Sequence, residues 1–417
     1  MLKHVSADRV HQRARAAVGA RLGVFRRRFG KWIAFSQYGF PFSVGPYPTP
    51  VARFRALARR TRFVRTGELS HAVANIAMIL GWPFGACLAA RATCARMRRR
   101  GQGPHGMRIF FDMVRLALRH SIPPLEYELY RFYEPAQRKH LHEYVYWNDL
   151  PGLAVLNARL GADNRDVQDK DRFAQICAMN GIPHVQTLAV FEGGRQVDPA
   201  TPFVPDVRQI WAKALRLKGG AGGAKWVKDG NVYCDAHGRR VSTVSLAGEF
   251  CKQDCVVQPF VENHPDIAQV TNGALASLRI VTGLNERAEA EFVASLIALP
   301  HGACETSVAG IVCSIERETG RVRHAAFPDG RRVECHPDTG LPIVGIDLPF
   351  WRQCVDLVRR SHAAAFPHFA FLGWDVALTR EGPILLETNS GWGALFHQML
   401  DGPLGNTAFS RLVSLYV

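Results

Sequence analysis

Residues 373–391 read GWDVALTREGPILLETNSG, and this stretch contains two short apolar runs, WDVALT and PILLET, joined by a Glu-Gly pair. Apolar runs of this length on either side of a turn signal are typical of a β-hairpin. We therefore expect two antiparallel strands with Asp375 opposite Glu387. Glu387 and Asn389 are two residues apart on one strand, so their side chains point to the same face.

This hairpin is a candidate metal site. Asp375, Glu387 and Asn389 would bring three oxygen donors together, and Mg²⁺ prefers a few such ligands with its other positions left for phosphates and water. A surface hairpin with solvated acids is the alternative. The buried site is favoured because Glu387 directly follows three aliphatic residues in the run ILLE.

A glycine-rich segment lies earlier in the chain, in KALRLKGGAGGAKWV, which starts at Lys213 and contains Gly219, Gly220, Gly222 and Gly223. Such a loop between strands lets backbone N–H groups approach phosphate oxygens without hindrance from Cβ atoms. The segment is not a Walker A motif, because no GK[ST] followed by a helix is present. A plain flexible hairpin is the alternative, and the lysine on the preceding strand favours a phosphate site.

Three further residues fit the same kind of ligand. Lys170 begins an expected helix in QDKDRFAQICAMNGIP, although a solvated lysine is the ordinary alternative. Gln258 lies in VVQPF, where the proline leaves the next strand unpaired on one side, as recognition of a purine edge needs. Arg279 lies mid-strand in ASLRIVTGL and needs an anionic partner. That partner is either a protein carboxylate or a phosphate, and both remain open.

The charge of the chain is unevenly distributed. The net charge is +16 over 417 residues, yet residues 1–120 hold 23 Lys and Arg against 3 Asp and Glu. A basic excess of this kind suggests an anionic partner. Residues 69–90 are apolar and lead into the Arg98-Arg99-Arg100 run. Three interpretations stay open for this segment: a pair of core helices, an interfacial membrane segment, or a true span.

Several other classes are disfavoured by the sequence. The ten cysteines form no CxxC pair, so we expect reduced cytosolic thiols and no zinc site. The N-terminus has no apolar core typical of a signal peptide, because arginines interrupt it. The basic region contains no recognised nucleic-acid motif, so we expect no nucleic-acid partner.

The second part of the chain is expected to mix strands and helices. Short runs rich in β-branched residues, such as CVVQPFV, ASLRIVTGL and AEFVASLIAL, are typical of strands. Helices are expected at residues 169–180 and 348–366. This layout indicates an α+β fold, without the regular alternation of a doubly wound parallel sheet.

In chain order, these features resemble the ATP-grasp superfamily, and most closely the sugar-transfer-associated ATP-grasp family. The matching motifs are DKDRFAQICAMNGIP, IWAKALRLKGGAGG, VVQPFVENHP, SLRIVT, HPDTGLPIVGIDLPFW and GWDVALTREGPILLETN. The resemblance implies an ATP-grasp fold, in which two α+β subdomains clamp ATP, preceded by a basic, mainly helical N-terminal module.

We accordingly expect a basic helical module over residues 1–120 and an ATP-grasp domain over 121–417. Within that domain, we expect a helical lead-in at 121–168, the N-terminal and lid subdomains at 169–262, and a C-terminal Mg-binding subdomain at 263–417.

The resemblance also implies roles for individual residues. The implied ATP-binding residues are Lys170, Lys213, Gly220, Gly222, Gly223, Gln258, Val261 and Asp266. The implied ligands of one or two Mg²⁺ ions are Asp375, Glu387 and Asn389. Arg279 would be the catalytic cation, neutralising charge on a transferred phosphoryl group. His336 is expected on the γ-phosphate side as a substrate contact, with a surface turn as the alternative.

The implied activity is ATP-dependent joining of a carboxylate to an amine through an acyl phosphate, in polysaccharide or secondary-metabolite modification. A phosphotransferase on the same fold and a degenerate binding module are the alternatives, because a fold does not settle chemistry. The expected substrates are small or lipid-linked acids and amines. We expect a cytoplasmic protein, with the basic module contacting the anionic inner face of the membrane.

Overall fold

The computed structural model describes residues 48–63, 69–101, 103–197, 203, 205–215, 223–304, 306–307 and 310–417. Residues 1–47, with which the basic segment begins, therefore lie outside the described residues. The described chain forms two compact units. The helical unit contains Ala56–Leu141 and Tyr146–Asp149, and the two-sheet unit contains Pro48–Arg55, His142–Val145 and Leu150–Val417. The boundary expected at residue 120 stays a prediction.

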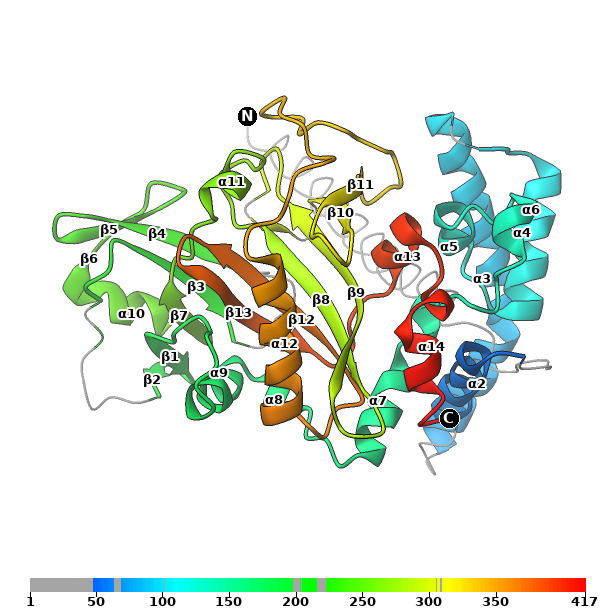
Figure 1. Cartoon of the computed structure of the whole chain (residues 1–417), viewed down its shortest axis with the longest axis horizontal. Coiled ribbons are helices and arrows are strands. Elements are labelled where there is room, and N and C mark those ends of the chain that lie inside the picture. Colours follow the sequence, from blue (N-terminus) through cyan, green and yellow to red (C-terminus); the bar gives the residue numbers. More distant parts are fainter. Residues whose placement is uncertain are drawn as a thin grey trace, which may run out of the picture. The chain divides into compact units, whose positions relative to one another are not determined.

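The helical unit is built around one long helix, α3 (Figure 1). Its helices are the end of α2 (Pro50–Phe63), α3 (Leu69–Arg100), α4 (Met107–His120), α5 (Pro124–Leu129), α6 (Pro135–Arg138) and the short η1 (Trp147–Asp149). The stretch GQGPHG, residues 101–106, separates α3 from α4. Residues 69–90 belong to one helix rather than a helix pair, even though it contains Pro83.

Packing explains why α3 folds against its neighbours. Trp82 and Ala86 on α3 are buried in one cluster with Ala117 on α4. Arg96 on α3 makes an ion pair with the buried Glu128 on α5. Within the described ranges, no helix combines the length and apolar character that crossing a bilayer requires.

The two-sheet unit has a seven-stranded sheet near its start, in the order β2-β1-β7-β3-β4-β5-β6. Its strands are β1 (Ala189–Glu192), β2 (Arg195–Gln196), β3 (Gln209–Ala214), β4 (Ala224–Asp229), β5 (Val232–Asp235), β6 (Arg240–Ser242) and β7 (Cys255–Pro259). Every pairing among them is antiparallel. The short helices η2 (Thr243–Ser245) and α10 (Leu246–Phe250) follow β6, and α10 buries Leu246 and Phe250 against one sheet face.

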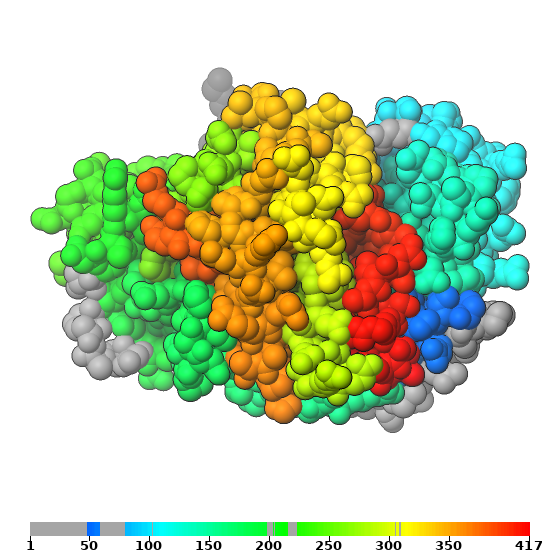
Figure 2. Space-filling view, viewed as in Figure 1, coloured from blue at the N-terminus to red at the C-terminus, as the bar shows by residue number. Residues whose placement is uncertain are grey.

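A second, six-stranded antiparallel sheet has the order β11-β10-β9-β8-β12-β13. Its strands are β8 (Ser277–Leu284), β9 (Ala290–Leu299), β10 (Ile311–Ile315), β11 (Val322–Ala326), β12 (Phe371–Thr379) and β13 (Gly382–Asn389). Helix α12 (Trp351–Ala365) packs on one face through Leu357 and Val358, and its atoms (orange) cover that face in Figure 2. On the opposite face lie α13 (Leu395–Asp401) and α14 (Ala408–Val413), which contact Val312 and Phe371.

The segment before β1 joins the two sheets. It contains α7 (Pro151–Arg159), α8 (Arg165–Gln168) and α9 (Lys170–Met179), while α11 (Pro265–Ala268) and η4 (Leu404–Asn406) lie in later loops. After α9 the chain pairs with β13, since Leu385 donates its N–H to Pro183 O at 2.9 Å. The two sheets are thereby held side by side, and the predicted α+β class is confirmed.

Candidate active site

The hairpin that carries the predicted metal ligands forms as expected. Asp375 on β12 pairs with Glu387 on β13, and a β-bulge follows directly at Asp375/Val376. Bulges of this kind redirect side chains next to functional sites. Asn389 donates from Nδ2 to Glu387 Oε1 at 3.3 Å, so both side chains lie on one face. The structure therefore brings the three predicted oxygen donors together.

Arg279 lies on the other side of Asp375, because β8 pairs with β12 in a register that places these two residues opposite each other. Its guanidinium makes a two-pronged contact with the carboxylate: Nη2 donates to Oδ2 at 2.7 Å and Nε donates to Oδ1. The sequence allowed either a protein carboxylate or a phosphate as the partner of Arg279. In this ligand-free structure the partner is the carboxylate of Asp375. The sequence could not decide this, because strand order determines which acid lies beside Arg279.

Burial and neighbouring charges shift the two carboxyl groups in opposite directions. Burial raises the pKa of Asp375, and the nearby charge of Glu387 raises it further against the attraction of Arg279. Burial also opposes the charged form of Glu387, yet the positive charge of Lys213 and the hydrogen bond from Asn389 hold the pKa of Glu387 below its usual range, with further help from nearby cations. Two carboxylates this close repel each other, and a bound cation would relieve that repulsion.

Two lysines, one on the seven-stranded sheet and one on helix α9, approach the same carboxylates. Lys213 on β3 is deeply placed, and burial lowers its pKa to about 8, although the charge of Glu387 acts in the opposite direction. Lys170 opens α9 and donates from Nζ to Leu215 O at 3.1 Å and to Ala214 O at 3.4 Å. Burial lowers the pKa of Lys170 as well. Both lysines therefore lie beside Glu387, as a phosphate-binding pair requires.

The remaining predicted nucleotide contacts are only partly described. Gln258 is buried on β7 opposite Trp211 of β3, and Val261 follows directly after that strand. The Asp266 side chain is 66% exposed at the start of α11, open to a ligand. Gly223 precedes β4, whereas Gly220 and Gly222 lie outside the described residues. The roles predicted for these residues stay predictions.

Comparison with known protein families matches residues 156–412 to the family described as sugar-transfer associated ATP-grasp. The match covers more than half of the 417 residues and every predicted site residue. The chain belongs to this family. No curated protein matches the chain.

Solved structures similar to this ATP-grasp chain include three ligases. The VanG D-Ala:D-Ser ligase from Enterococcus faecalis is 14% identical with a TM-score of 0.34, covering 60% of this chain and 62% of its own. D-alanine-D-alanine ligase from Helicobacter pylori is 12% identical with a TM-score of 0.34, covering 60% and 58%. The ATP-grasp ligase PsnB is 14% identical with a TM-score of 0.31, covering 62% and 61%. The chain thus spans less than two thirds of each of these proteins.

The donor set of this ATP-grasp chain fits Mg²⁺. Two carboxylates and one amide oxygen suit a hard cation that keeps its other positions for phosphates and water. Elsewhere in the described part of the chain, no cluster of three or more His, Cys, Asp or Glu side chains is arranged for a metal. Asp375, Glu387 and Asn389 are therefore the residues that would hold the ion.

Sequence reasoning missed part of the surroundings of Glu387. A cavity of about 350 Å³ lies between the α8–α9 junction, the end of β3 and the end of β13. Among its lining residues, Arg165, Gln168 and Thr388 were not predicted. Thr388 and Gln168 lie within two residues of predicted site residues in the chain, and this proximity could have identified them as lining residues. Only the tertiary contact of α8 with β13 places Arg165 there.

A second unpredicted feature is the close approach of Trp392 to Gly373. A Cβ atom at Gly373 would come within 2.4 Å of Trp392 Cβ and 3.4 Å of Arg279 Cδ. Trp392 is buried, and its ring lies 6.4 Å from that of His397, measured between centroids. A glycine is therefore needed at this position so that the indole can pack beside Arg279.

His336 is held by backbone contacts. It is fully buried, and its Nε2 lies 3.1 Å from Pro300 O, while Asp338 N–H donates to its Nδ1 at 3.3 Å. Nε2 thus fastens the 336–338 turn to Pro300 at the end of β9, whereas Nδ1 holds the turn itself together. This arrangement supports a structural role, and the predicted substrate contact stays a prediction.

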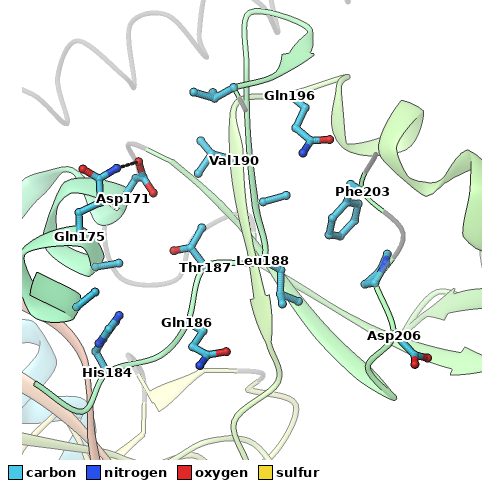
Figure 3. Close-up of a pocket in the computed structure, with 15 residues that line it drawn as sticks. Asp171, Gln175, His184, Gln186, Thr187, Leu188, Val190, Gln196, Phe203 and Asp206 are labelled. Atoms are coloured by element: carbon cyan, nitrogen blue, oxygen red, sulfur yellow. Dashed lines mark hydrogen bonds between the residues drawn. The ribbon is translucent and has the colours of Figure 1, made fainter. Parts of the chain in front are cut away.

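A larger cavity than the one beside Glu387, of about 880 Å³, has a different set of lining residues (Figure 3). It is bordered by α9 with Asp171 and Gln175, and by the segment from His184 to Val190. None of the residues predicted for ATP or Mg²⁺ lines it. Size alone therefore does not identify the active site of this chain.

Proposed function

We propose that this ATP-grasp chain is an ATP-dependent ligase that joins a carboxylate to an amine through an acyl phosphate, releasing ADP and phosphate. The observation that carries the proposal is the cluster of buried Asp375 with half-buried Arg279, Lys213 and Glu387. Two cations and two acids meet there at the junction of two antiparallel sheets. Such a cluster suits transfer of a highly charged phosphoryl group, which depends on positioning and charge neutralisation.

In the first step, a carboxylate oxygen of the acid attacks the γ-phosphorus of ATP. The bond from that phosphorus to the β,γ-bridging oxygen breaks, and ADP leaves with the electron pair. Lys213 and Arg279 neutralise the charge that develops on the transferred group. When bound, Mg²⁺ supplies further charge neutralisation and orients the phosphates. Asp375, Glu387 and Asn389 would hold this ion.

In the second step, the amine nitrogen attacks the acyl carbon, phosphate leaves, and the amine loses a proton. Water competes with the amine for the same carbon, so the site must be closed during this step. The glycine-rich segment that leads to Gly223 is the part of the chain suited to cover the phosphates.

Isotope transfer tests this mechanism. The enzyme is supplied with ATP, Mg²⁺, an amine and candidate acids whose carboxylate carries ¹⁸O. A ligase transfers one ¹⁸O to the released phosphate, and hydroxylamine in place of the amine gives a hydroxamate. A kinase instead leaves a stable phosphorylated product without releasing phosphate, and that result would replace the ligase proposal.

We further propose that the acid or the amine is carried on a lipid or belongs to a polysaccharide or secondary metabolite. The family description, sugar-transfer associated, supports a link to glycan chemistry. The basic balance of residues 1–120 supports a peripheral position on the anionic inner face of a membrane. A substrate screen with soluble and lipid-linked forms of one acid tests the lipid-linked part of this proposal. A preference for the soluble form would contradict that part.

A further inference from the structure

One face of α3 leaves large apolar side chains in solvent. Leu80, Phe84 and Leu88 are 68%, 71% and 37% exposed. They are spaced four residues apart, so they form one row along the helix. The buried residues Trp82 and Ala86 are each two positions away, which places them on the opposite side, toward the core of the helical unit.

The same face becomes basic toward the C-terminal end of α3. At about 100° per residue, Arg91, Arg98 and Arg99 all lie within about 60° of the direction of Phe84. All three arginines are exposed. Helix α3 contains no Asp or Glu from Leu69 to Arg100, so no acid on this helix offsets them.

The arginines of α3 divide into two groups by their partners. Arg96 and Arg100 face inward and make ion pairs with Glu128 of α5. For Arg91, Arg98 and Arg99, the described ranges contain no acidic partner at ion-pair distance. The inward arginines therefore have a structural role, whereas the outward three are available for an external anion.

We propose that this face of α3 docks on an anionic lipid surface. Leu80, Phe84 and Leu88 enter the boundary between headgroups and acyl chains, and the three outward arginines contact lipid phosphates. An apolar row beside basic residues on one helix face is typical of helices that lie in a membrane interface. A nucleic acid would contact the arginines but leave the apolar row in water. The inference rests on the peripheral position proposed above and assigns its surface.

Vesicle cosedimentation of the full chain tests the assignment. The probes are vesicles of phosphatidylcholine alone and of phosphatidylcholine with phosphatidylserine at roughly 7:3, in about 0.1 M salt. We expect the unaltered chain to bind the mixed vesicles. The triple change R91Q/R98Q/R99Q should lower the partition coefficient about 100-fold, at about fivefold per arginine. The triple change L80S/F84S/L88S should lower it at least about tenfold.

A matched control uses the neighbouring helix α4, where Phe111 is 60% exposed and the Arg115 side chain is 61% exposed. Arg115 is within 3.5 Å of Asp112, so its charge is already offset. The double change F111S/R115Q removes the same chemical groups and should leave vesicle binding unchanged.

Four outcomes would overturn the assignment. Equal binding of the unaltered chain and both α3 variants would show that attachment uses other residues, with the peripheral position itself intact. An effect of the arginine changes alone would mean that the apolar row is not inserted. An equal loss in the α4 variant would mean that vesicle binding is not specific to this face of α3. Absence of any vesicle binding would remove the peripheral position as well. Stabilisation by Mg-ATP, measured on the same variants, reports on the two-sheet unit separately.

Discussion

We expect the positive charge of Lys213 to destabilise the ligand-free protein, although the same charge is the one proposed to bind ATP. A buried ammonium without a phosphate partner is poorly solvated, and this lowers the pKa of Lys213 from 10.5 to about 8. Replacing it with methionine keeps a side chain of similar length without the charge. We therefore expect Lys213→Met to raise the free energy of unfolding of the ligand-free chain, while abolishing its response to Mg-ATP.

The magnitude follows from the pKa difference of about 2.5 between the unfolded and folded states. At about 1.4 kcal/mol per pH unit, charging Lys213 in the folded site costs at most about 3 kcal/mol at neutral pH. This value already includes the attraction of Glu387, which acts to raise the pKa. The expected gain for Lys213→Met is therefore about 1–3 kcal/mol at pH 7.

The pH dependence gives a sharper signature. Between pH 8 and 10.5, the unfolded chain holds a proton on Lys213 that the folded chain has released. The free-energy penalty for burying charged Lys213 is fully present below pH 8 and is lost between pH 8 and 10.5. The free energy of unfolding therefore rises with pH across that window. The advantage of Lys213→Met over the unaltered chain should shrink accordingly as the pH rises.

Urea unfolding of both proteins at several pH values measures this difference. The control is Lys252→Met in the turn after α10, where the lysine side chain is 68% exposed and the same change should leave stability nearly unaltered. A Lys213→Met protein less stable than the unaltered chain at pH 7 would refute the reasoning. So would an advantage that stays constant up to pH 10.

Further predictions concern the other site residues. Mg-ATP should raise the melting temperature of the unaltered chain, because it binds the native state, and the absence of a thermal shift at millimolar concentrations would contradict the nucleotide site. Glu387→Gln should lower ADP release at least ~100-fold with an unchanged circular dichroism spectrum, whereas unaltered turnover would place the metal elsewhere. Gly373→Ala should displace Trp392, costing about 1–3 kcal/mol of stability together with activity, as melting and turnover measurements can show. His336→Gln should lower the melting temperature but leave the KM for the acid unchanged, and a tenfold rise in that KM would restore its substrate role.

Local sequence patterns were sufficient where neighbours in the chain are also neighbours in space. The β12–β13 hairpin is one example, because alternation along two adjacent runs fixes which side chains share a face. Asp375, Glu387 and Asn389 accordingly meet as expected. The start of α9 is another, since Asp169 caps it by accepting bonds from Asp171 N and Arg172 N.

Other features could not be predicted because they depend on contacts between distant segments. The short strands β2, β5 and β6 were missed, because runs of two to four residues carry too little alternation to identify. In the first unit, a single helix formed where a helix pair was one expectation, and it packs against α4 and α5.

The sequence by itself determined the family and the α+β class, and it named the residues predicted to bind ATP and Mg²⁺, because these depend on local motifs in a fixed order. Only the tertiary structure decided that Arg279 faces Asp375 and that Lys213 lies beside Glu387. The order of strands in a sheet and the junction between two sheets set those distances. Burial at that junction then sets the pKa values on which the proposed chemistry depends.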